Sequence, residues 1–223
     1  MWAVVPLKQL EQAKARLANV LTAEERRALM LAMARDVLTA LGRSKRLTGI
    51  LIVSRTPEAD ALAQAFGTER FAEGPGANLS QALVQASEHL ASRLEARGVM
   101  IVPADVPLIT PAEIDAILEQ QDRVTVVPDD ENVGTNCLIC SPPNCIPYVF
   151  DGSSFKPHVD AAFSLGITPT IMPSAGFALD IDTPDDLRTL LDRDPACQTG
   201  SYLAKSGIAE RLSDADNGSL TSR

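Results

Sequence analysis

Short apolar runs alternate with longer segments of helical periodicity along most of the chain. The short runs are rich in β-branched residues, which is typical of strands, and the longer segments repeat apolar residues at helical spacing. This alternation predicts βα units around a mostly parallel sheet. The expected strands are AVVP at 3–6, ILIVS at 50–54, VMIVP at 99–103, VTVVP at 124–128, NCLIC at 136–140 and TPTIM at 168–172.

Capping residues mark where the helices begin. Thr22 and Glu25 have the spacing of a capping box. Three Thr-Pro pairs, at 56, 110 and 183, mark further helix starts, because proline loses nothing at a position that has no intrahelical amide partner. The predicted helices cover 22–41, 56–66, 78–97 and 153–165, and two more begin at 110 and 183.

These elements predict an α/β fold of three layers, αβα, around a mostly parallel central sheet. The run at 99–103 is apolar enough to form a central strand that helices cover on both faces. With 223 residues and 45% hydrophobic content, the chain has enough apolar material for one sizeable core. We therefore expect one domain over residues 1–195 and, where the composition turns small and polar, a loosely ordered tail over 196–223.

The charge and hydropathy of the chain exclude two classes of partner. A formal net charge of −9 opposes general affinity for nucleic acid, because such binding needs a basic surface that displaces counterions. No apolar run is long enough to span a membrane, and residues 1–6 are too short for a signal-peptide core. We therefore expect a cytoplasmic protein without a membrane partner, in which a local cationic cluster or a metal ion binds any anionic ligand.

The four cysteines, Cys137, Cys140, Cys145 and Cys197, include one CxxC spacing. That spacing occurs in zinc and redox sites. In an extended segment, however, residues three apart point to opposite faces, so these two thiols would diverge. The sequence therefore favours free, partly buried thiols over a metal site or a disulfide.

Asp105 follows the apolar run at 99–103 and lies between Pro103 and Pro107. Ligands bind outside the carboxyl ends of the strands in open α/β sheets, and Asp105 lies at such an end. The prolines restrict the backbone on either side, which would hold the carboxylate in place. The alternative is that Asp105 only caps the next turn.

Asp180 and Asp182 lie two residues apart in a segment with an extended pattern. Their carboxylates then point to the same side, and two like charges so close repel unless a cation lies between them. Together with Asp105 they would suit Mg²⁺ or Mn²⁺, since the set contains only oxygen donors. In the alternative, Asp182 and Asp186 favour the positive end of the helix that begins at 183, which leaves Asp180 unexplained.

Lys8, Lys14 and Arg16 follow the first strand of an otherwise acidic chain. Each alone is compatible with a solvated surface side chain, but three cations in one βα loop indicate a clamp for a triphosphate. The chain lacks both the G-x-x-x-x-G-K-[ST] phosphate loop and the G-x-G-x-x-G dinucleotide fingerprint. A nucleotide site must therefore be of another kind.

Two glycine-containing stretches could contact a small anion. Gly134 and Thr135 offer close backbone approach and a hydroxyl, and residues 152–154 precede a helix whose free amides attract anions. Ser153 is equally well explained as a plain N-cap. His158, one turn into that helix, is compatible with packing or with a substrate contact, and packing is favoured. No Ser/His/Asp arrangement is evident, so covalent catalysis is disfavoured.

Several stretches between residue 2 and about residue 191 form a recognisable set: VPLK with AKARL, SRTPEA, NLSQAL, PADVPLIT, GTN, FDGSSFKPH and ALDIDTPDDL. In this order they closely resemble the 2-phospho-L-lactate guanylyltransferase family, which acts in biosynthesis of the deazaflavin coenzyme F-420. The resemblance implies a fold of the glycosyltransferase-A and nucleotide-diphospho-sugar transferase type. It also implies transfer of a guanylyl group from GTP to the phosphate of a three-carbon acid. Our hypothesis for this transfer is direct in-line attack without an enzyme-bound nucleotide.

The resemblance further implies roles for residues at matching positions. The residues implied to hold Mg²⁺ or Mn²⁺ are Asp105, Asp180 and Asp182. Those implied to contact the acid are Thr135, Gly152 and Ser154. Those implied to bind the nucleotide are Lys8, Lys14, Arg16, Ser54 and Asn78. Those expected to carry catalysis are Asp105, Lys14 and Arg16.

Three questions stay open at the level of the sequence. The acid differs within the family among 2-phospho-L-lactate, phosphoenolpyruvate and 3-phospho-D-glycerate, and no residue here identifies it. The alternatives to this function are a nucleotidyltransferase for a molybdopterin or a sugar phosphate, and a non-catalytic module that binds GTP or a phospho-acid. A homodimer is compatible with the sequence, which contains nothing that establishes one.

Overall fold

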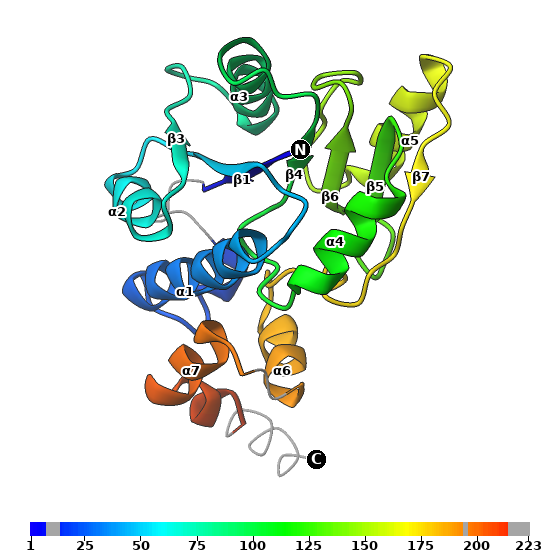
Figure 1. Cartoon of the computed structure of the whole chain (residues 1–223). Coiled ribbons are helices and arrows are strands. Elements are labelled where there is room, and N and C mark those ends of the chain that lie inside the picture. The colour runs from blue at the N-terminus through cyan, green and yellow to red at the C-terminus, as the bar shows by residue number, and fades with distance from the viewer. Residues whose placement is uncertain (8–13, 194–195, 214–223) are drawn as a thin grey trace.

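The computed structural model describes residues 1–7, 14–193 and 196–213, and the strands in these ranges form one seven-stranded sheet (Figure 1). The strands are β1 (Trp2–Pro6), β2 (Gly49–Val53), β3 (Glu69–Phe71), β4 (Val99–Ile101), β5 (Val124–Pro128), β6 (Thr135–Cys140) and β7 (Thr170–Ile171). Their order is β3-β2-β1-β4-β6-β5-β7. Among these strands only β6 runs antiparallel to its neighbours, so the predicted mostly parallel sheet is confirmed.

Helices cover both faces of the sheet, which confirms the predicted three layers (Figure 1). The helices are α1 (Ala23–Gly42), α2 (Pro57–Phe66), α3 (Leu79–Arg93), α4 (Pro111–Gln120), α5 (Phe155–Ser164), α6 (Pro184–Asp192) and α7 (Gln198–Lys205), with a 3₁₀ helix η1 (Ala15–Leu17). Alternate strand residues enter two hydrophobic clusters: Ala3 and Val5 pack with α1, α2, α4, α6 and α7, whereas Val4 packs with α3 and α5. Within the described residues, no helix combines the length and the apolar character that crossing a membrane requires.

The capping residues form the hydrogen bonds that their spacing predicts. At α1, Thr22 Oγ1 accepts from Glu25 N at 3.2 Å, and Glu25 Oε2 accepts from Thr22 N at 2.8 Å. The same reciprocal bonds begin α4 and α6. Helix α2 begins at Pro57 and ends before Gly67, whose φ of 62° lies in the left-handed region that glycine favours.

The C-terminal segment differs from the prediction of a loose tail that starts at residue 196. Helix α7 packs against α1, and Leu203, Ile208 and Leu212 are buried in the same cluster as α1. Asp36 of α1 accepts hydrogen bonds from two backbone amides at the start of α7, at 2.8 Å each. Most residues of this segment are small or polar, but its three buried apolar residues lie at near-helical spacing and pack on α1. The prediction of a loose tail is therefore wrong for residues 198–213. Residues 214–223 lie outside the described part of the chain.

The cysteines of the CxxC spacing diverge, as an extended segment requires. Cys137 enters the cluster on one face of the sheet, and Cys140 enters the cluster on the other. Burial raises the pKa of the Cys137 thiol. A hydrogen bond with Cys140 lowers the pKa of the half-buried Cys145 to about 7, and the charge of Arg123 acts in the same direction. Among Cys137, Cys140 and Cys145, the pKa is lowered only for Cys145, and a lower pKa favours the thiolate.

Glu113 fixes the segment that follows β7 to helix α4. One of its carboxylate oxygens accepts from Ser174 Oγ at 2.8 Å and from Gly176 N at 2.7 Å, and the other accepts from Thr110 N at 3.1 Å. Gly176 is required here, because a Cβ at this position would lie 2.8 Å from Leu108 O and against the Glu113 carboxylate. The same segment carries two of the candidate metal carboxylates, so Glu113 anchors the chain that delivers them to the site.

Replacing Glu113 by Gln should lower the free energy of unfolding by about 1–2 kcal/mol at neutral pH, because a glutamine offers one acceptor oxygen to donors on both sides. Burial alone would raise the pKa of Glu113, but hydrogen bonds from Gly176, Thr110 and Ser174 outweigh burial and hold the pKa below its ordinary value. The carboxylate therefore contributes its full stability above the unfolded pKa, about 4.3, and loses it as pH falls through the lower folded pKa.

Urea unfolding of the wild type and the Glu113→Gln variant at about pH 7 and about pH 3 measures this effect. The difference between the two proteins should shrink at the lower pH. Glu119→Gln on the same helix is the matched control, since its side chain is 66% exposed, and it should change stability by less than about 0.5 kcal/mol. An equal loss for Glu113→Gln at both pH values would contradict the role of the charge.

Candidate active site

A cavity of about 400 Å³ opens at the edge of the sheet where the parallel strands end. Residues at or just after the carboxyl ends of three strands line it: Pro6 of β1, Asp105 after β4 and Asp129 after β5. Strand β6 runs in the opposite direction, so its first residues, Thr135 and Asn136, reach the same edge. The position of the cavity is the one expected of ligand sites in open α/β sheets.

Most of the predicted site residues line this one cavity. They are Lys14, Asp105, Thr135, Gly152, Ser154, Asp180 and Asp182. These residues come from five separate parts of the sequence, between the first strand and the start of α6. The fold therefore brings the candidate metal, nucleotide and acid contacts into a single space.

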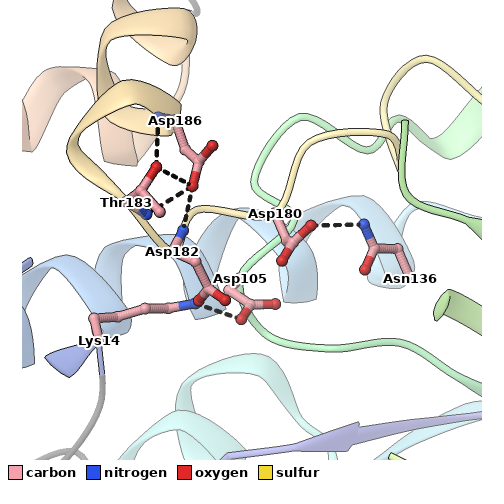
Figure 2. Close-up of polar contacts among 7 residues, drawn as sticks. All are labelled: Lys14, Asp105, Asn136, Asp180, Asp182, Thr183 and Asp186. Atoms are coloured by element: carbon pink, nitrogen blue, oxygen red, sulfur yellow. Dashed lines mark hydrogen bonds and ion pairs between the residues drawn. The ribbon is translucent and has the colours of Figure 1, made fainter. Parts of the chain in front are cut away.

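Lys14 joins Asp105 and Asp182 within this group (Figure 2). Its Nζ lies 2.6 Å from Asp105 Oδ2 and 2.5 Å from Asp182 Oδ1, and the lysine side chain is only 5% exposed. Burial alone would lower the pKa of Lys14, but the two carboxylates outweigh burial and raise the pKa above its ordinary value. The ammonium is thus charged, and two carboxylates that lie far apart in sequence share it.

Asp180 faces the same cavity but binds a different partner. Asn136 Nδ2 donates to Asp180 Oδ1 at 3.1 Å (Figure 2) and to Phe177 O at 2.8 Å. Burial raises the pKa of Asp180, and the negative charges of Asp105 and Asp182 raise it further. Asp180 would therefore gain a favourable partner if a further cation entered the cavity.

Backbone contacts hold Asp182 beside Asp105. Ile181 N donates to Asp105 O at 3.1 Å, which joins the two segments. Asp186 Oδ2 accepts from Asp182 N at 2.9 Å and belongs to the cap of α6 (Figure 2). Asp186 thus takes part in the cap of α6, whereas the Asp182 carboxylate is paired with Lys14.

The donors in the cavity fit a hard divalent cation. The three predicted aspartates, Asp105, Asp180 and Asp182, line it, and Asp105 Oδ1 is buried without a hydrogen-bond partner in the described part of the chain. Oxygen donors of this kind are the ligands that Mg²⁺ and Mn²⁺ prefer. In the arrangement that the described residues adopt, no three acidic side chains surround a common point, and the Lys14 ammonium stands between two of them. In this arrangement the Lys14 ammonium is the cation that balances Asp105 and Asp182.

Thr135, Gly152 and Ser154 bring hydroxyls and backbone to the same cavity. Thr135 Oγ1 lies 3.0 Å from Nδ1 of His158, which is fully buried and is also hydrogen-bonded through Nε2. Ser154 is buried and is the N-cap residue of α5, but its side chain makes no capping bond. Gly152 has a φ of 96°, in the left-handed region that favours glycine. His158 is therefore buried, as the predicted packing role requires, and it also forms hydrogen bonds through both ring nitrogens.

Three other predicted nucleotide residues, all within the described part of the chain, do not line the cavity. Arg16 is exposed on η1, and Asn78 is the N-cap of α3, where its side chain accepts a backbone hydrogen bond. Ser54 is buried, and its hydroxyl lies 3.0 Å from Thr56 Oγ1. Lys8 lies outside the described residues. Their roles in nucleotide binding stay predictions.

Sequence reasoning missed two polar residues of the cavity, Asn136 and Asp129. Asp129 follows β5 as Asp105 follows β4, so the rule that ligands bind beyond strand ends could have identified it. Its carboxylate accepts from the amides of residues 133 and 134, at 2.8 and 2.7 Å, and so holds the turn that leads into β6. Asn136 ends the GTN stretch of the family resemblance, but no local pattern identifies its partner, which lies 44 residues away in the sequence.

Known proteins of similar structure support the fold. A solved structure from Desulfovibrio desulfuricans G20, described as a nucleotide-diphospho-sugar transferase, matches with a TM-score of 0.76 over 96% of both chains. The two sequences are 17% identical, so this likeness shows the shared fold. The likeness confirms the fold that the sequence predicts.

Relatives identified by sequence show the family of the chain as well as its fold. The phosphoenolpyruvate guanylyltransferase of Conexibacter woesei is 36% identical over 85% of this chain and 86% of its own length. The 2-phospho-L-lactate guanylyltransferase of Methanobrevibacter ruminantium is 31% identical over 93% of this chain and 92% of its own length. Residues 1–222 match the family described as guanylyl transferase CofC like. The chain therefore belongs to the CofC-like guanylyl transferase family.

Proposed function

We propose that the cavity transfers the guanylyl group of GTP to the phosphate of a three-carbon phospho-acid and releases pyrophosphate. The observation that carries the proposal is that Lys14, Asp105, Asp180 and Asp182 share one cavity with the Thr135 hydroxyl. An ammonium and carboxylates that can hold a cation are the groups that neutralise phosphates during transfer. Membership of the guanylyl transferase family supports the identity of the group transferred.

The acceptor class is supported by the two relatives named above. Phosphoenolpyruvate and 2-phospho-L-lactate share a three-carbon skeleton, a phosphate and a carboxylate, and 3-phospho-D-glycerate has the same groups. The cavity volume of about 400 Å³ lies within the range of small-molecule sites, about 300–1,000 Å³. We extend this class of acceptor to the present chain, and with it a role in coenzyme F-420 biosynthesis.

The transfer needs no covalent enzyme intermediate. A phosphate oxygen of the acid attacks the α-phosphorus of GTP, opposite the oxygen that bridges to the β-phosphorus. The new phosphorus–oxygen bond forms as the bond to this bridging oxygen breaks, and pyrophosphate leaves with the bonding electrons. The attacking phosphate is already ionised at neutral pH, so no general base is needed. The described lining of the cavity accordingly contains no histidine.

Lys14 would change partners when the substrates enter. Its ammonium would move from Asp105 and Asp182 to the triphosphate and stabilise the pyrophosphate that leaves. The carboxylates of Asp105, Asp180 and Asp182 would then be the ligands of Mg²⁺ or Mn²⁺. Such an ion, when bound, supplies positive charge to the phosphates and polarises the reacting phosphoryl group. Arg16, exposed on η1, is a further cation available to the triphosphate.

Pyrophosphate release tests the proposed reaction directly. The purified protein should release pyrophosphate from GTP and Mg²⁺ when one of the three acids is present, and it should release less with ATP or CTP. The acid that supports release is the acceptor. Release with a sugar phosphate or a molybdopterin alone, or with no acceptor at all, would contradict the proposed acceptor class.

Asp105→Asn and Asp182→Asn should each lower kcat/KM by about 100-fold or more, because each removes a charge that balances the cations of the site. Asp185→Asn is the matched control, since this side chain lies nearby in sequence and is 89% exposed. It should keep near-normal activity. Steady-state kinetics at saturating Mg²⁺ measure the effect, and near-normal turnover of Asp105→Asn or Asp182→Asn would show that the carboxylates have another role.

A further inference from the structure

We propose that His158 is a positioning residue that turns the hydroxyl proton of Thr135 into the cavity, where it binds an anionic oxygen of the acceptor acid. This inference deepens the proposed function and rests on it. It leaves the Thr135 hydroxyl proton available to the substrate, because the histidine donates to one of the hydroxyl lone pairs and does not accept this proton. His158 acts on the substrate only through Thr135.

The tautomer of His158 follows from the hydrogen bond at Nε2. The backbone N–H of Val149, which can only donate, lies 3.0 Å from this nitrogen. Nε2 must therefore present its lone pair to Val149. In a neutral imidazole the proton is then on Nδ1.

The ring of His158 is neutral at physiological pH. Its side chain has 0% exposure, and burial lowers the pKa of His158 to about 4, although the negative charge of Asp151 opposes this shift. A protonated ring would also place an Nε2 proton against the N–H of Val149. Both the burial and the geometry therefore favour one neutral form.

The Nδ1 proton of His158 consequently points at Thr135 Oγ1, 3.0 Å away. A hydroxyl has one proton and two lone pairs, and the histidine occupies one of the lone pairs. The Thr135 proton must therefore point elsewhere, and Thr135 lines the cavity. With the opposite tautomer, Thr135 would donate to the ring and would present only lone pairs to an anion.

Packing keeps the ring in this orientation. Phe150 makes an edge contact with His158, with ring centroids 4.9 Å apart and planes at 62°, and Phe150 also lines the cavity. His158 N donates to Ser154 O at 3.1 Å, in the first turn of α5. The helix that holds the ring therefore also holds Ser154 at the cavity wall. A flip of the imidazole would put a carbon atom opposite Thr135 and break both bonds.

A hydroxyl whose proton points into the cavity favours an anion there. The carboxylate and the phosphate of the acid accept hydrogen bonds and would accept one from Thr135. Loss of a hydrogen bond to a charged group costs about 10- to 100-fold in affinity. Loss of the hydrogen bond from Thr135 should thus weaken binding of the acid and leave the affinity for GTP unchanged.

The tautomer can be read directly by long-range ¹H–¹⁵N correlation spectroscopy of protein labelled with ¹⁵N-histidine at neutral pH. The chain has two histidines, so a His89→Gln variant leaves only the signals of His158. We expect the pattern of a single tautomer with the proton on Nδ1. A proton on Nε2, or the pattern of an imidazolium, would overturn the proposal.

Kinetics with the acceptor acid separate positioning from a purely structural role. His158→Phe should raise KM for the acid by about 10- to 100-fold and leave KM for GTP unchanged. His158→Asn keeps a donor near the position of Nδ1 and should restore KM to within about threefold of the wild type. Equal increases in both KM values, or no rescue by asparagine, would contradict the proposal.

Substitutions at Thr135 give an independent test that does not disturb the histidine. Thr135→Ser should behave like the wild type, Thr135→Val like His158→Phe, and the double variant no worse than either single variant. Additive losses would show that the two residues act separately. The spectroscopic measurement needs no active enzyme, so it still decides the tautomer if none of the acids supports turnover and the proposed function fails.

Discussion

The site depends on one ammonium that two carboxylates share. The chain carries a net charge of −9, and the fold brings Asp105, Asp180 and Asp182 into one cavity. Without a cation, charges so close would repel one another and oppose the fold that gathers them. Lys14 supplies that cation, at 2.6 Å from Asp105 and 2.5 Å from Asp182. It leaves Asp180 with the Asn136 amide as its partner and with a raised pKa, because burial and the charges of Asp105 and Asp182 oppose ionisation of this carboxyl.

The rest of the fold delivers these groups to one edge of the sheet. Parallel strands place Asp105 at a carboxyl end, and the single reversed strand among those described, β6, brings Thr135 and Asn136 to the same edge. Glu113 anchors the segment that returns from β7, and Asn136 binds that segment at two points. The cavity is therefore assembled by contacts between elements that lie far apart in the sequence. Its geometry depends on tertiary structure more than on any one motif.

This dependence explains how much the sequence could predict. Helix starts were predictable because local capping chemistry decides them, as at Thr22 and Thr183, where both reciprocal bonds form. The two aspartates at 180 and 182 were predictable from their spacing and from their position before a helix. The direction of β6 and the contact between Asn136 and Asp180 were not, because partners distant in sequence decide them. Nor does any local pattern give the tautomer of His158, which one backbone amide fixes.

The most direct test of the site is the affinity of the protein for Mn²⁺ without substrates, measured by electron paramagnetic resonance. If Lys14 occupies the place of a divalent cation, the ion and the ammonium compete for Asp105 and Asp182. Lys14→Met should then bind Mn²⁺ more tightly than the wild type, and a variant with both Asp105→Asn and Asp182→Asn should lose binding. Weaker binding by Lys14→Met, or wild-type binding by the double aspartate variant, would contradict a cation site at these carboxylates.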